Sequence, residues 1–102
     1  MNCRLQIEDS AFVPGHAAGE SGYILWPGEC PRDLSKILTH DRDHAVDCAV
    51  VDQGRTVYAG PARVKRKMRY GSETVLVILL PGTDLGRLSR SAVIELDLAT
   101  FD

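Results

Sequence analysis

The feature that most constrains the fold is an internal echo between two segments of the chain. Residues 23–28 read YILWPG and residues 77–82 read VILLPG, so both apolar runs stop at Pro-Gly. After each Pro-Gly comes a short stretch that contains Asp-Leu, at positions 33–34 and 84–85, and then another apolar run. Because Pro and Gly interrupt regular structure, each copy predicts a strand, a short helix and a second strand.

Apolar periodicity predicts the strands. A half-exposed strand alternates polar and apolar positions, as residues 92–98 do, with residues 93, 95 and 97 on one face. A strand that is apolar on both faces is predicted to be central, as residues 74–80 are. The predicted strands are 4–7, 23–26, 45–51, 56–59 continuing to 70, 74–80 and 92–98.

Turn residues separate several of these strands. Residues 52–55 read DQGR, which has the chemistry of a hairpin turn. Gly71-Ser72 marks a second turn, ahead of the strand at 74–80. Gly60-Pro61 predicts a bulge or an edge within the strand that leads to it, because Pro cannot donate to a ladder of hydrogen bonds.

Two short helices are predicted between strands. Leu34, Ile37 and Leu38 lie at helical spacing after Pro31 and place one apolar stripe on the first helix. The polar residues 40–44 end it. Residues 83–88 predict only a turn or two of helix, because Gly86 weakens it.

Written as elements, each half of the chain reads strand, strand, helix, strand, and the predicted halves are residues 1–52 and 55–98. On its apolar strands, Pro-Gly ends and leucine-bearing helices, the chain resembles the cradle-loop barrels, which include double-psi barrels and AbrB-like DNA-binding proteins. It is also similar to small barrel domains found beside bacteriocin-protection proteins. The resemblance covers residues 22–98.

This resemblance implies a mostly β protein with one or two short helices (α+β). The expected architecture is a small closed or partly closed β-barrel built from two strand-strand-helix-strand halves. A generic α+β fold or a β-sandwich is the alternative.

Length and composition predict one globular domain over residues 1–102. The chain is 44% hydrophobic and 25% charged, as ordinary soluble domains are. Residues 1–4 lead directly into an alternating segment, without the pattern of a signal peptide. The longest apolar run, residues 75–80, is far below the roughly 20 residues that cross a bilayer. Three cysteines, an odd number, fit a reducing compartment. We therefore expect a cytoplasmic protein that has no membrane partner.

A basic run is the strongest functional feature. Residues 63–69 read RVKRKMR and hold five of the twelve Lys and Arg residues, while the rest of the chain has seven basic and fourteen acidic residues, a net of −7. In a strand, alternate side chains share one face, about 6.6 Å apart. The cations on that face would be Arg63, Lys65, Lys67 and Arg69, and the opposite face would carry Ala62, Val64, Met68 and Tyr70.

Such a row of cations predicts an anionic partner. It could follow the phosphate backbone of a nucleic acid, where Lys and Arg release counterions, or it could meet an acidic protein surface. Tyr58 and Tyr70 are expected at the margin of the row, whereas the row itself has no aromatic residue on which bases would stack. The structural alternative is that the cations protect an exposed edge strand from pairing with other chains.

A second cluster is the run His40-Asp41-Arg42-Asp43-His44. Two histidines four residues apart on a helix could hold a metal, but the surrounding sequence does not predict a helix past position 39. The interpretation we adopt is a solvated polar loop, with no metal and no cofactor.

Two residues are candidate nucleophiles. Cys30 precedes Pro31 and would lie at a helix N-terminus, which lowers the pKa of a thiol, whereas Cys3 and Cys48 are expected to be buried in strands. The tetrapeptide Tyr70-Gly71-Ser72-Glu73 resembles the processing site of the pyruvoyl-dependent aspartate decarboxylases. That resemblance implies that Ser72 would become the pyruvoyl group, with Arg69 or Tyr58 at the substrate. The alternative is a plain turn.

The sequence therefore favours a binding or interaction module without catalytic residues, which contacts an anionic partner through its cationic hairpin. The alternatives are an inhibitor or regulator of another protein and a small barrel enzyme that uses Ser72 or Cys30. A homodimer is a further expectation, since an edge strand and Trp26 both offer docking surface.

Overall fold

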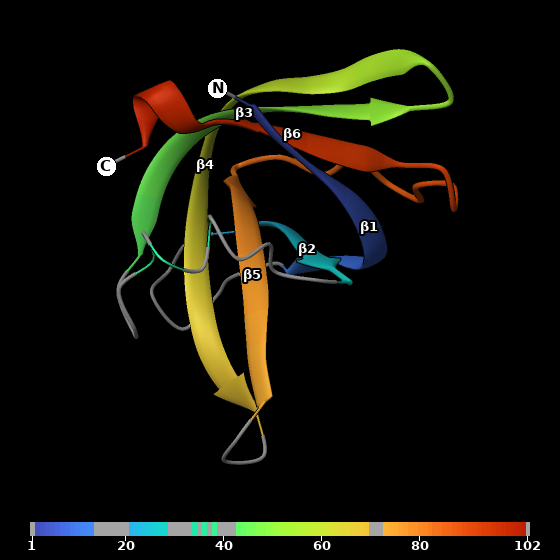
Figure 1. Ribbon diagram of the computed structural model, residues 1–102. Coiled ribbons are helices and arrows are strands. Elements are labelled where there is room, and N and C mark those ends of the chain that lie inside the picture. Colours follow the sequence, from blue (N-terminus) through green and yellow to red (C-terminus); the bar gives the residue numbers. More distant parts are fainter. Residues whose placement is uncertain are drawn as a thin grey trace.

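The chain folds as a closed barrel of six antiparallel strands in a computed structural model (Figure 1). The structure describes residues 2–13, 21–28, 34, 36, 38, 43–69 and 73–101, with the backbone alone at 67–69 and 73–75. The elements are β1 (Asn2–Val13), β2 (Gly22–Pro27), β3 (His44–Asp52), β4 (Arg55–Arg69), β5 (Glu73–Pro81), β6 (Val93–Asp97) and the 3₁₀ helix η1 (Leu98–Thr100). Around the barrel the strands follow the order β1-β2-β5-β4-β3-β6. The predicted mostly β barrel is confirmed, and of the two alternatives, closed or partly closed, the barrel is closed.

Two long strands close the barrel because each changes its neighbour midway. β1 pairs with β6 over residues 2–6 and with β2 from Ile7 onward, with a register shift between Ile7 and Asp9. β4 pairs with β3 over residues 55–64 and with β5 over residues 63–69. The register shift in β1 lies where the strand passes from β6 to β2. A bulge bends a strand and increases its twist, which suits this change of neighbour.

The connectivity is the same for the first three strands and the last three. Exchanging β1, β2 and β3 with β4, β5 and β6 leaves every pairing in place, because β1–β2 becomes β4–β5 and β3–β4 becomes β6–β1. The two segments of the Pro-Gly echo lie on β2 and β5, which this exchange interchanges, but the residue-by-residue match does not preserve which side chains face the core. The matched residues Leu25 and Leu79 face opposite ways, since Leu25 is buried in the core and Leu79 is half-buried on the other face.

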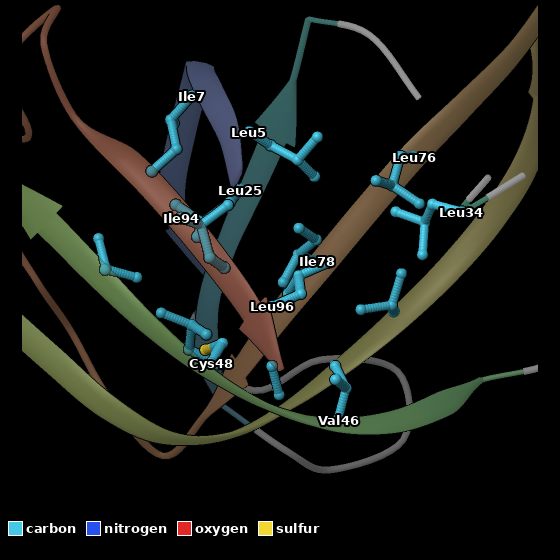
Figure 2. Packing of buried hydrophobic residues seen from close by; sticks show 14 of the residues in the cluster. Leu5, Ile7, Leu25, Leu34, Val46, Cys48, Leu76, Ile78, Ile94 and Leu96 are labelled. Carbon is cyan, nitrogen blue, oxygen red and sulfur yellow. The ribbon is translucent and has the colours of Figure 1, made fainter. Parts of the chain in front are cut away.

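The core fills the inside of the barrel with apolar side chains from alternate strand positions (Figure 2). Leu25, Ile78 and Leu96 are fully buried there, on three different strands. Leu34 and Leu38, from the connection between β2 and β3, belong to the same cluster. The predicted apolar stripe is confirmed for these two leucines, whereas Ile37 lies outside the described residues.

The prediction of one or two short helices is not borne out among the described residues, where no α-helical element is delimited. Leu34 and Lys36 have helical backbone, and the Leu38 N–H donates to the Leu34 carbonyl at 3.2 Å. The short helix predicted at residues 83–88 is wrong. Gly82, just before this stretch, and Gly86 within it have φ of 66° and 68°, values that break a right-handed helix, and residues 83–89 form a loop without regular secondary structure.

Two local predictions within the β3–β4 hairpin can be compared with the structure. The hairpin turn at 52–55 is confirmed, with φ of 53° at Gln53 and 77° at Gly54, the signature of a type I′ turn. Of the two alternatives predicted at Gly60-Pro61, the bulge is wrong, because both residues pair regularly with β3 and the register shift lies between Val50 and Val51. The edge is confirmed, because among the described strands β4 pairs with β5 only from Arg63 onward and these two residues pair with β3 alone. Within the described residues, no helix is long and apolar enough to cross a membrane.

Candidate functional site

The cationic row lies on the outer face of β4 where its side chains are described. Ala62 and Val64 are buried in the barrel, Arg63 is exposed and Lys65 is half-buried. The predicted alternation is therefore confirmed over residues 62–65. The side chains of Lys67 and Arg69, and all of Tyr70, lie outside the described residues.

Arg66 occupies an inward position on β4. It follows the alternation of Ala62 and Val64, is half-buried, and has its Nε atom fully buried. It therefore belongs with the barrel side of the strand and not with the cationic row, although it contributes to the charge of the basic run.

Residues 65–69 of the basic run lie on a two-stranded ribbon that extends beyond the barrel (Figure 1), whereas Arg63 lies where β4 still pairs with β3. β4 pairs with β3 only as far as Val64, opposite His44, and β5 pairs with β2 from Ile78 onward. Among the described strands, the pairs from Lys65–Val77 to Arg69–Glu73 are bonded to each other alone. Both outer edges of this ribbon thus offer backbone groups that no barrel strand uses.

Tyr58 is not brought together with the cationic row. It lies near the opposite end of β4, on the same face of the strand as Ala62. Its hydroxyl donates a hydrogen bond to the Pro61 carbonyl at 2.6 Å. Burial raises the pKa of Tyr58, and the nearby Cys48 and Asp47 add to the effect. Its ring packs over Gly60, where a Cβ would meet the Tyr58 hydroxyl at 3.3 Å.

The predicted solvated loop at residues 40–44 is wrong at its last residue. His44 is 3% exposed and stacks on Phe101, with ring centroids 4.9 Å apart and an interplanar angle of 22°. The reason is that His44 is the first inward position of β3, against which the C-terminal segment folds back. Residues 40–42 lie outside the described residues, as do Cys30 and Ser72.

The two described cysteines, Cys3 and Cys48, are not joined in a disulfide. Cys48 is buried, as predicted, and its burial together with the charge of Asp47 raises its pKa to about 12. Cys3 is half-buried. In the part of the chain that the structure describes, no group of three or more His, Cys, Asp and Glu side chains could hold a metal ion.

A charged cleft of about 380 Å³ is a feature that the sequence analysis missed. One wall is the bulged stretch of β1, residues 7–10, and the other is the loop at 86–90. It forms where β1 leaves β6 to pair with β2, since the Ile7 N–H still bonds to the Ala92 carbonyl at 3.1 Å while the next residues diverge. The only local sequence signal for this cleft is the polar composition of residues 86–91 (GRLSRS). That segment overlaps residues 83–88, for which the sequence predicts a short helix and not a cleft wall.

The loop wall of the cleft is held by side chains from three strands. The Tyr23 hydroxyl on β2 donates to the Gly86 carbonyl, and Ser89 bonds to Asp52 at the end of β3, with its N–H 3.0 Å from Oδ2. On β1, Gln6 Nε2 reaches the Arg90 carbonyl at 3.4 Å. These bonds fix the loop backbone on the barrel.

Comparison with protein-family models, with curated proteins and with solved structures gave no match for this chain. The candidate sites are therefore assessed on their own geometry.

Proposed function

We propose that the β4–β5 ribbon binds duplex nucleic acid through Arg63, Lys65, Lys67 and Arg69. The observation that carries this proposal is the coincidence of the basic run with the part of the hairpin that extends past the barrel strands. The major groove of duplex DNA admits a two-stranded β-ribbon. A ribbon that is paired only within itself, and that carries Lys65, Lys67 and Arg69 with Arg63 at its base, is suited to that groove.

The charge distribution supports a localised contact. The basic run concentrates five cations between residues 63 and 69, four of them on the ribbon, while the rest of the chain has a net charge of −7. Phosphates are attracted to the first region and repelled by the second, so the acidic barrel directs the ribbon toward the polyanion. Because these contacts involve phosphates, they supply affinity and position and do not by themselves select a base sequence.

The test is titration of the purified protein against a fluorescent DNA duplex at two salt concentrations. The variant is Lys65→Glu combined with Lys67→Glu. The matched control is Lys36→Glu combined with Arg55→Glu, which changes the net charge equally at two exposed cations elsewhere on the chain. We expect the ribbon variant to weaken binding by at least about tenfold, and to lower the salt dependence of log K by about 0.9 for each phosphate that the variant no longer neutralises.

Three results would contradict this proposal. Equal weakening in both variants would mean that only net charge matters. Absence of duplex binding by the wild-type protein at low salt would end the nucleic-acid proposal. Binding of poly-L-glutamate, without binding of DNA, would assign the ribbon to an acidic protein surface.

The other expectations from the sequence stay predictions. They are a cytoplasmic location, a homodimer, membership of the cradle-loop group, and the alternatives of a regulator of another protein or an enzyme that uses Ser72 or Cys30. A mass split between Gly71 and Ser72 would identify the pyruvoyl chemistry directly.

A further inference from the structure

The cleft between β1 and the loop at 86–90 has walls of opposite charge. Glu8 and Asp9 lie on the β1 wall, while Arg87 and Arg90 lie on the loop wall. All four side chains are exposed. The loop follows the end of β5 that is remote from the ribbon tip, so this cleft is separate from the cationic row.

These opposite charges do not neutralise each other across the cleft. Within the part of the chain that the structure describes, neither arginine forms an ion pair with Glu8 or Asp9. The carboxylate of Glu8 lies over Gly28, just past the end of β2, close to the position that a Cβ would take there. Asp9 uses one carboxylate oxygen to accept the Ser10 N–H at 2.9 Å. The Asp9 carboxylate is thus held on its own wall.

Both walls are ordered by contacts outside the cleft. The Tyr23 hydroxyl bridges them from behind, because it contacts Ser10 Oγ at 2.9 Å and also bonds to the Gly86 carbonyl. Ser89 is fixed by Asp52, and a further bond joins Ser89 Oγ to Ser91 Oγ at 2.8 Å. A ligand that binds here does not have to order the two backbones, and preorganisation of this kind lowers the cost of binding.

We propose that this cleft binds a small zwitterion, an amino acid or a dipeptide. The guanidinium groups of Arg87 and Arg90 suit a carboxylate, which they can bind with two parallel hydrogen bonds. The carboxylates of Glu8 and Asp9 suit an ammonium group on the opposite wall. A molecule with both groups matches both walls at once, and a cavity of about 380 Å³ lies at the small end of the range for ligand sites.

The experiment compares three probes of similar size by titration in amide NMR spectra of the full chain. Glycylglycine carries both charges, N-acetylglycine carries the carboxylate alone, and glycinamide carries the ammonium alone. We expect glycylglycine to give saturable shifts in the amides of residues 7–10 and 86–90, and to bind about tenfold more tightly than either single-charge probe.

A pair of variants localises the binding. Arg87→Gln with Arg90→Gln is expected to weaken glycylglycine binding by at least about tenfold, as loss of charge-assisted hydrogen bonds does. The control is Arg4→Gln with Arg55→Gln, two exposed arginines outside the cleft lining, which should leave the affinity unchanged. The amide spectrum of each variant shows that the barrel is intact.

Several outcomes would overturn the proposal. One is that glycylglycine produces no saturable shift at either wall, and another is that the control variant loses as much affinity as the cleft variant. Equal binding of N-acetylglycine and glycylglycine would show that the acidic wall takes no part, so the zwitterion would be the wrong class. Because the DNA titration uses the ribbon and this one uses the cleft, failure of one leaves the other intact.

Discussion

Ser89, in the loop before β6, donates two hydrogen bonds to the carboxylate of Asp52 at the end of β3. The Ser89 N–H lies 3.0 Å from Oδ2, and the Ser89 hydroxyl bonds to Oδ1. The two residues are 37 positions apart in the sequence. This contact joins the central hairpin turn to the loop that forms one wall of the charged cleft.

The first prediction concerns the pH dependence that this contact creates. The side-chain and backbone hydrogen bonds from Ser89 lower the pKa of Asp52 below its ordinary value of 3.8. A group with a lowered folded pKa stabilises the protein above its unfolded pKa, and this contribution is lost as the pH falls through the folded value. Asp52→Asn should therefore be less stable than wild type at neutral pH, and the difference should shrink in acid.

Urea unfolding at neutral pH and below pH 3.8 measures that difference. Asp84→Asn is the control, because Asp84 also accepts a backbone N–H, from Gly86 at 2.9 Å, but within its own loop. A stability difference for Asp52→Asn that stays constant across the pH range would contradict the assignment.

The second prediction concerns the hydroxyl of Tyr23. Tyr23 is 1% exposed, and its hydroxyl contacts both Ser10 Oγ and the Gly86 carbonyl. Tyr23→Phe leaves those groups without their partner and should cost about 1–3 kcal/mol in the free energy of unfolding. Tyr58→Phe is the matched control, since its hydroxyl bonds to an exposed carbonyl, and it should change stability by about 0.5 kcal/mol or less. Equal costs in thermal or urea unfolding would refute this interpretation of Tyr23.

The third prediction concerns the reactivity of the Cys48 thiol. Burial raises its pKa from 9.0 to about 12, so the reactive thiolate is scarce at neutral and mildly alkaline pH. In a variant with Cys3→Ala and Cys30→Ala, iodoacetamide should label Cys48 slowly in buffer and rapidly in urea. Intact mass over time measures both rates, and a native rate close to that in urea would show that the thiol is accessible.

The fourth prediction concerns the centre of the barrel. Leu96 is fully buried on β6 between β1 and β3. Leu96→Ala removes methyl groups from the closed core and should cost about 2–5 kcal/mol. Val57→Ala, at a residue that is 43% exposed, is the control and should cost about 0.5 kcal/mol or less. The two changes would be indistinguishable in urea unfolding if the interior of the barrel were loosely packed.

The candidate sites show where sequence reasoning succeeded. The outward positions of Arg63 and Lys65 could be predicted, because Ala62 and Val64 alternate with them and a strand has a period of two. The placement of Tyr58 could not, since it depends on the ring packing back over Gly60 and reaching the Pro61 carbonyl. The cleft was also out of reach, because it needs residues 7–10 beside residues 86–90.

The sequence by itself indicated a mostly β chain, the approximate positions of its strands and the turn at 52–55, because alternation and turn chemistry act over a few neighbouring residues. The barrel was an expectation from a family resemblance, and its closure depends on strand pairing. Only the tertiary structure decided the register. Leu25 and Leu79 match in the Pro-Gly echo, yet one points into the core and the other away from it. A shift of one residue in strand register moves every side chain of the strand to the other face. The register is set by strand pairing, and the sequence echo carries no information about pairing.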